Sequence, residues 1–121
     1  MPEQLHDANS LIEREIRQRA TAVESLLDAN VVTYIGDIDD SAQGLLKAAI
    51  ESISPHKRKL VVCLETTGGS IESAERIKNT FRHHYSTVDF IVTTFAMSAG
   101  TVLVMSGDNI YMDYSASLGD R

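Results

Sequence analysis

Short runs of β-branched and aromatic residues recur along the chain and are typical of buried strands. They cover residues 31–35, 60–64, 88–95 and 109–112. Between these runs, apolar residues return every three to four positions, which is the spacing of one face of a helix. Strands that alternate with helices indicate an α/β fold, with a mainly parallel sheet and right-handed crossovers.

Three helices are expected between and after these strands. The first begins with Asp40 or Ser41 as its cap and ends before Pro55. The second covers about 71–82, and the third is a short apolar helix over 101–106. The apolar face of the first helix consists of Leu45, Leu46, Ala49, Ile50 and Ile53.

A further amphipathic helix is expected before the first strand, from about Glu3 to Leu27. Its apolar positions are Leu5, Ala8, Ile12, Ile16, Ala20, Val23 and Leu27. Such a stripe needs a partner surface, either on the same domain or on a neighbouring subunit. We therefore divide the chain into an N-terminal amphipathic helix, residues 1–30, and an α/β domain, residues 31–121.

Charge and composition exclude several classes of function. With 17 acidic and 11 basic side chains, the net charge is -6, which disfavours nucleic acid as a partner. The single cysteine, Cys63, lies within an apolar run, so we expect it to be buried and to hold no metal. The sequence contains no apolar run of membrane-spanning length and no secretion signal, so a cytoplasmic protein is expected. No cofactor is expected.

Two turns carry the residues with chemical potential. Gly68 and Gly69 follow one strand, and Ser98 follows another. Because both turns lie at the carboxyl edge of a parallel sheet, they are expected to share one cleft. The glycines allow a backbone amide to approach an anion, and Ser98 occupies a strand-to-helix position similar to a nucleophile elbow. This pairing suits acyl transfer through a serine and an oxyanion hole.

Each turn also has a simpler interpretation. A glycine pair after a strand is often just a tight turn, and a serine before Ala99-Gly100 is often a helix cap or a site of close packing. Phosphate binding is a further alternative for the glycine turn. However, no P-loop lysine follows it and the dinucleotide-binding glycine pattern is missing.

In combination, five segments resemble the serine dehydrogenase proteinase family, a relative of signal peptide peptidase A and of the proteolytic subunit of Clp protease. They are Thr67-Gly68-Gly69-Ser70, Glu75-Arg76-Ile77, Ala96-Met97-Ser98-Ala99-Gly100-Thr101, Asp108-Asn109-Ile110-Tyr111-Met112-Asp113 and Leu118-Gly119. The resemblance implies a Clp/crotonase-like fold, incomplete at the C-terminus, that cleaves a peptide or protein substrate. It also implies a homo-oligomer, because relatives form rings or stacked trimers.

The resemblance assigns roles residue by residue. It implies that Ser98 is the nucleophile and that the backbone amides of Gly69 and Ala99 are the oxyanion donors. Gly68 would permit the turn, and Gly100 would let the helix of the nucleophile pack closely beneath the site. Family members commonly have a proline where this chain has Thr67.

The general base is the missing part. Families of this fold take a His or a Lys from further along the chain, and the chain as it stands is expected to be inactive for that reason. We place none of the available basic residues beside Ser98, namely His6, His56, His83, His84, Lys47, Lys57, Lys59 and Lys78. Two alternatives remain open: a catalytically dead scaffold or assembly subunit, and a crotonase-like enzyme acting on acyl-CoA. The Ser98 turn argues against the latter.

Overall fold

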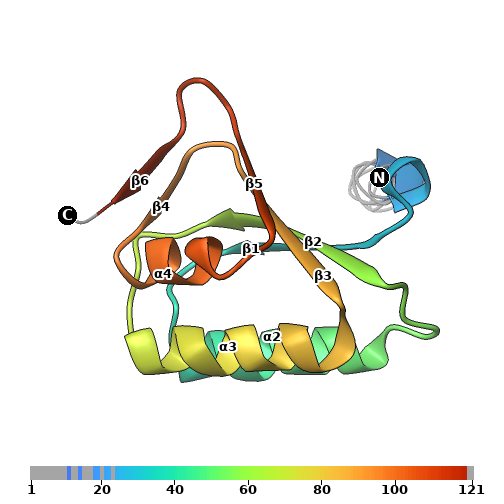
Figure 1. Ribbon diagram of the computed structural model, residues 1–121, viewed down its shortest axis with the longest axis horizontal. Helices are drawn as coiled ribbons and strands as arrows, with labels where there is room; N and C mark the ends of the chain where they lie inside the picture. The colour runs from blue at the N-terminus through green and yellow to red at the C-terminus, as the bar shows by residue number, and fades with distance from the viewer. Residues whose placement is uncertain (1–10, 12–13, 15–17, 20, 23, 120–121) are drawn as a thin grey trace, which may run out of the picture.

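The computed structural model describes residues 11, 14, 18, 19, 21, 22 and 24–119. Its main sheet has four strands in the order β1-β2-β3-β5, and every neighbouring pair is parallel (Figure 1). The strands are β1 (Asn30–Ile35), β2 (Lys59–Glu65), β3 (Thr87–Val92) and β5 (Asn109–Met112). The predicted α/β fold with a mainly parallel sheet is confirmed. The predicted N-terminal helix lies mostly outside the described residues.

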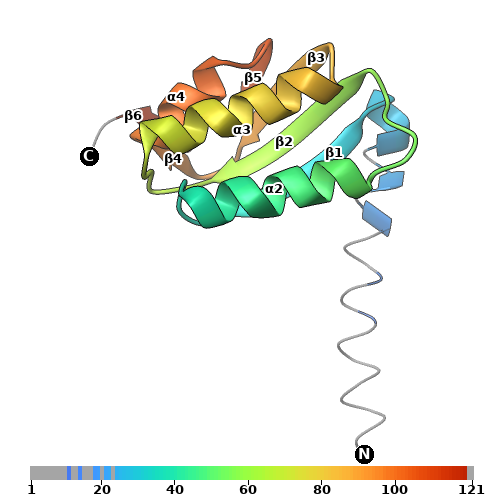
Figure 2. The same ribbon diagram turned by 90° about the horizontal axis from the view of Figure 1, so that it is seen from below.

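Helices α2 (Asp40–Ser52) and α3 (Ile71–His84) run side by side along one face of this sheet (Figure 2). Alternate residues of the central strands point toward them and form the core with the apolar stripes of the helices. The largest fully buried side chains are Phe81, Phe90, Ile38, Ile50, Leu60 and Ile77. The core thus lies between the sheet and the helix pair.

Helix α2 differs from its prediction at two points. Its N-cap is Asp39, whose Oδ1 accepts the Ala42 N–H at 2.8 Å, so the predicted caps were wrong by one or two positions. Its buried stripe is Ala42, Leu46 and Ile50, which follow one another at intervals of one helical turn. Leu45 is 65% exposed and Ala49 is also exposed, because both lie to the side of that stripe, so their predicted place on the apolar face was wrong.

The strand predicted over 88–95 is in fact two strands. After β3 ends, the chain bends through Thr93 and Thr94 and forms β4 (Phe95–Met97), which pairs in parallel with β6 (Ser117–Gly119) in a second, two-stranded sheet. The prediction missed β6. Helix α4 (Ala99–Met105) begins two residues earlier than predicted, directly after Ser98. The candidate nucleophile therefore follows a strand of the second sheet and not, as expected, a strand of the main sheet.

The two sheets are joined through the continuation of β2. Thr66 pairs with Ala96 in an isolated bridge, in which the Thr66 N–H donates to Phe95 O at 3.2 Å and the Met97 N–H donates to Thr66 O at 3.0 Å. Figure 1 shows β4, β6 and α4 gathered toward the end of the molecule at which α3 begins. The candidate site lies at that end.

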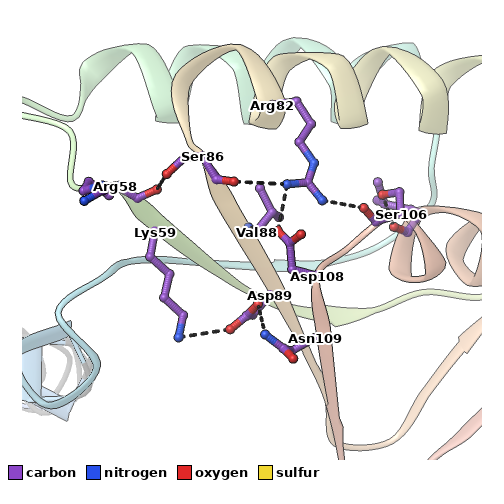
Figure 3. Close-up of polar contacts among 10 residues, drawn as sticks. Arg58, Lys59, Arg82, Ser86, Val88, Asp89, Ser106, Asp108 and Asn109 are labelled. Carbon is purple, nitrogen blue, oxygen red and sulfur yellow. Dashed lines mark hydrogen bonds and ion pairs between the residues drawn. The ribbon is translucent and has the colours of Figure 1, made fainter.

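The far end of α4 is fixed by Arg82 of α3 (Figure 3). The guanidinium donates from Nη2 to Ser106 O at 2.8 Å and from Nη1 to Asp108 Oδ2 at 2.7 Å. The same Asp108 oxygen accepts the Val88 N–H at 2.8 Å. One arginine thus ties the C-terminal ends of α3 and α4 to the beginning of β3.

Asp108 predicts a small pH dependence of stability. Hydrogen bonds from Arg82 and from the Val88 amide lower the pKa of its carboxyl group. A lowered folded pKa means that the stabilisation is present above the unfolded pKa, about 3.9, and is lost as pH falls through the folded pKa. Because the side chain is 43% exposed, we expect Asp108→Asn to cost less than about 1 kcal/mol at pH 7. Urea unfolding between pH 7 and pH 3 should show a shallower acid loss for the variant, and parallel curves would contradict this.

The opposite face of the main sheet contains a buried ion pair, also visible in Figure 3. Asp89 is fully buried, with Lys59 Nζ 3.0 Å from its Oδ2 and the Asn109 amide donating to its Oδ1 at 3.0 Å. Cys63 lies on this face as well, because its neighbours Val62 and Leu64 point into the helix-covered core. The thiol is half-buried, not fully buried as predicted, and burial raises its pKa.

Candidate active site

Ser98 occupies a sharp turn between β4 and α4. It is the residue before the first turn of α4, and its φ of 55° and ψ of -121° lie in a region that non-glycine residues rarely adopt. Although it holds the N-cap position, its hydroxyl makes no capping hydrogen bond. A strained turn that presents an unengaged serine hydroxyl is the geometry of a nucleophile elbow.

The glycine turn lies directly against this serine. Gly68 has a φ of 116°, and a β-carbon added to it would lie 2.6 Å from Ser98 Cβ and 3.2 Å from Ser98 Oγ. The same β-carbon would lie 2.8 Å from Met97 O. No side chain other than hydrogen fits at this position, so the structure brings together the two turns that the sequence singled out.

The orientation of the Gly69 amide follows from the neighbouring hydrogen bonds. Gly68 O accepts the Ile38 N–H at 2.9 Å, so this carbonyl points toward Ile38. In a trans peptide the N–H of the next residue points the opposite way, and the Gly69 N–H is therefore directed away from Ile38. Gly69 directly follows the glycine that lies against Ser98, so its N–H is a candidate donor to this site.

Ala99 provides the second amide that the sequence proposed. As the first residue of α4, it has no intrahelical acceptor for its N–H. Within the described part of the chain, neither this N–H nor that of Gly69 donates to a protein acceptor. Two unpaired amides beside a serine hydroxyl are the donors that a tetrahedral oxyanion would require.

Gly100 packs against Thr66, the residue at which the two sheets meet. A β-carbon on Gly100 would lie 2.3 Å from Thr66 Cγ2, so glycine permits the close approach of α4 that was predicted. Thr66 is buried, and its Oγ1 accepts the Gly68 N–H at 3.0 Å. Thr66 therefore holds the glycine turn with its hydroxyl and supports the helix with its methyl group.

The sequence did not reveal how the end of β6 contributes. The Ser98 N–H donates to Gly119 O at 2.8 Å, and the Gly119 N–H donates to Thr101 Oγ1 at 3.0 Å. In the sequence, Leu118-Gly119 stands out only through the family resemblance. A strand-length apolar run would have been the signal for β6, but this strand has three residues.

No described basic side chain makes a hydrogen bond with Ser98. His56, His83 and His84 gather near the C-terminal end of α3, where the rings of His56 and His84 are 4.8 Å apart. A 14-residue helix is about 20 Å long, so they lie far from the glycine turn at its other end. Lys78 Nζ is 2.9 Å from Glu75 Oε2, an ion pair on the helix surface. His6 lies outside the described residues.

A cavity of about 190 Å³ lies at the carboxyl ends of β1 and β2 and is lined by Ile35, Gly36, Asp37, Glu65, Thr66, Thr67 and Phe95.

The described residues include no group of three or more His, Cys, Asp or Glu side chains placed to hold a metal ion. Within the same residues, no helix combines the length and apolar character needed to cross a membrane.

The family model of ClpP-like SDH-type serine proteinases matches residues 7–121. The chain belongs to this family. The catalytic domain of the ClpP protease from Plasmodium falciparum has a similar fold, with a TM-score of 0.58 and 15% identity over 67% of this chain and 53% of that one. The Clp-like fold that the sequence implied is confirmed.

Two relatives of the chain come from Methanocaldococcus jannaschii. The uncharacterized protein MJ1495 is 29% identical over 115 residues, which cover 88% of this chain and 38% of the relative. The uncharacterized protein MJ0137 is 32% identical over 82 residues, which cover 68% of this chain and 28% of the relative. The chain thus spans about a third of the length of these two relatives.

Proposed function

We propose that this member of the ClpP-like SDH-type serine proteinase family hydrolyses peptide bonds through an acyl-enzyme on Ser98. The observation that carries the proposal is the contact between the glycine turn and the strained serine, where a β-carbon added to Gly68 would lie 3.2 Å from Ser98 Oγ. A turn that merely reverses the chain would not require a glycine against a serine side chain. The amides of Gly69 and Ala99, which donate to no protein acceptor within the described part of the chain, add further support.

In the proposed reaction, Ser98 Oγ attacks the carbonyl carbon of the peptide bond and its proton passes to a general base. The carbonyl oxygen becomes an oxyanion, which accepts hydrogen bonds from the Gly69 and Ala99 amides. The base then protonates the leaving amine, and water hydrolyses the ester. The positive end of the α4 helix dipole also stabilises the negative charge of the oxyanion, but contributes only about 1 kcal/mol.

No described basic side chain makes a hydrogen bond with Ser98, so the general base has to come from elsewhere. We propose that it is supplied by the longer protein that the relatives represent or by a neighbouring copy of the chain. Self-association fits the Clp-like fold and the apolar side chains exposed on α4, where Met105 is 65% and Val102 is 40% exposed.

A serine-directed fluorophosphonate probe tests this proposal. We expect the 121-residue chain to label poorly, because a serine hydroxyl without a base is a weak nucleophile. A version extended to the length of its relatives should label well, and Ser98→Ala should abolish that labelling. Mass spectrometry of the labelled peptide identifies the modified serine.

Ser52→Ala is a matched control, because Ser52 is an exposed serine at the end of α2 whose hydroxyl bonds only Ala49 O. This variant should label like the parent. If the extended protein fails to label, the peptidase proposal is wrong and a scaffold role gains support. If the 121-residue chain labels strongly at Ser98, the base comes from the chain itself or from a second copy of it, and the expectation that a longer protein is needed is wrong.

A further inference from the structure

The strained conformation of Ser98 has to be maintained by its surroundings, since a non-glycine residue at positive φ costs free energy. On the helix side, Ser98 O accepts the N–H groups of Thr101 at 2.9 Å and Val102 at 3.3 Å. On the strand side, its own N–H donates to Gly119 O at 2.8 Å. The position of Gly119 therefore helps to determine the conformation of the elbow.

Gly119 is held in turn by the side chain of Thr101. Thr101 Oγ1 accepts the Gly119 N–H at 3.0 Å. The hydroxyl has one hydrogen to donate, and its nearer acceptor is Ala96 O at 2.9 Å, whereas Gly119 O lies at 3.3 Å. The hydroxyl thus uses both its donor and its acceptor capacity to join β6 to β4.

These contacts form a closed ring. The Ser98 N–H binds Gly119 O, the Gly119 N–H binds Thr101 Oγ1, and the Thr101 N–H binds Ser98 O. Because one of these hydrogen bonds is made by a side-chain hydroxyl, a substitution that removes this hydroxyl would break the ring. Thr101 is the only member that contributes a side chain.

We propose that Thr101 is a positioning residue for Ser98: through Gly119, its hydroxyl holds the nucleophile's backbone in the strained elbow. The effect of Thr101 on the reactivity of Ser98 rests on the proposed peptidase function, whereas its effect on the backbone geometry of Ser98 does not. Thr101 touches neither substrate nor Ser98 Oγ in this role. It acts only through the hydrogen-bonded ring.

The first test measures amide hydrogen exchange by NMR on the 121-residue chain. Thr101→Val keeps the shape but removes the hydroxyl, and should speed exchange of the Ser98 and Gly119 amides about tenfold, the factor expected for losing roughly one hydrogen bond. Thr101→Ser keeps the hydroxyl and should retain the parent rates. Thr80→Val is the matched control, because Thr80 Oγ1 bonds only Arg76 O on the exposed face of α3.

Exchange of core amides such as that of Val62 reports whether each variant remains folded. Unchanged Ser98 exchange in a folded Thr101→Val chain would overturn the proposal. Equal acceleration in Thr101→Ser would also overturn it, since the methyl group would then be responsible. If Thr101→Val does not fold, Thr101→Ala is compared with Thr101→Ser instead. The same difference in the exchange rate of the Ser98 amide is expected between these two variants.

The second test measures the rate of fluorophosphonate labelling in the extended protein. Thr101→Val should lower the labelling rate constant of folded protein at least about tenfold, and Thr101→Ser should restore it. A purely structural role would lower the unfolding midpoint and leave that rate constant unchanged, which would overturn the positioning role. If the parent protein does not label at all, the proposed function fails, and the exchange measurement still decides the role of Thr101.

Discussion

Replacing Gly69 by alanine should destabilise the protein by about 3–5 kcal/mol, from backbone strain and overpacking together. Gly69 has a φ of 148°, and a β-carbon on it would lie 2.2 Å from Ile38 O. That carbonyl oxygen also accepts the Ser70 N–H at 2.8 Å, so it cannot move without breaking the bridge between the two segments. Since small domains have only about 5–15 kcal/mol of stability, much of it would be lost.

Urea unfolding followed by circular dichroism measures this effect, with Gly44→Ala as the control. Gly44 lies within α2, and a β-carbon there would meet no atom within 4 Å. The control should therefore gain up to about 1 kcal/mol, from the higher helix propensity of alanine. A Gly69→Ala variant with the stability of the parent would show that the Ile38 contact is not as close as described.

Replacing Gly100 by alanine should cost about 2 kcal/mol, through a clash with one methyl group. The new β-carbon would lie 2.3 Å from Thr66 Cγ2. Thr66 cannot rotate this methyl group away without cost, because it is β-branched and its Oγ1 accepts the Gly68 N–H. Helix α4 would have to move outward instead, and Ser98 with it.

Thr66→Ser provides a direct check, because it removes Cγ2 and keeps the hydroxyl. Alone it should cost about 1 kcal/mol for the lost methyl group. Combined with Gly100→Ala, it should relieve the clash, so that the double variant is more stable than the sum of the single effects by at least about 1 kcal/mol. Additive effects in urea unfolding would mean that Gly100 is not in contact with Thr66.

The sequence was sufficient to predict the elements that have strong periodicity. The runs around Val62 and Phe90 are apolar because both faces of those strands are largely covered, and the glycine pair and Ser98 mark the ends of such runs. The predicted neighbourhood of Gly68 and Ser98 is confirmed, but the route differs: Ser98 follows β4 of the second sheet, and the bridge between Thr66 and Ala96 brings the two turns together. The roles of Ser98, Gly69 and Ala99 stay predictions until they are tested.

The remainder depends on contacts that leave little trace in the sequence. Residues 88–95 form one apolar run, although the chain bends after Val92 and enters a second sheet. Asp39, Asp40 and Ser41 are all good caps, and only the packing of Ala42, Leu46 and Ile50 selects Asp39. The hydroxyl of Thr101 serves a partner eighteen positions away in the chain, which no local pattern reveals.

The second sheet also has a consequence for the order of folding. The elbow depends on the pairing of Thr66 with Ala96 and of Ser98 with Gly119, and each pair joins segments that are distant in the chain. Such contacts form only after the entropy of closing long loops has been overcome, and β4 needs the carboxyl end of β2 as its template. We therefore expect the elbow to be a late product of folding. A nascent or partly folded chain would carry Ser98 as an ordinary, unstrained serine, so that the strained geometry would arise only when the fold is complete.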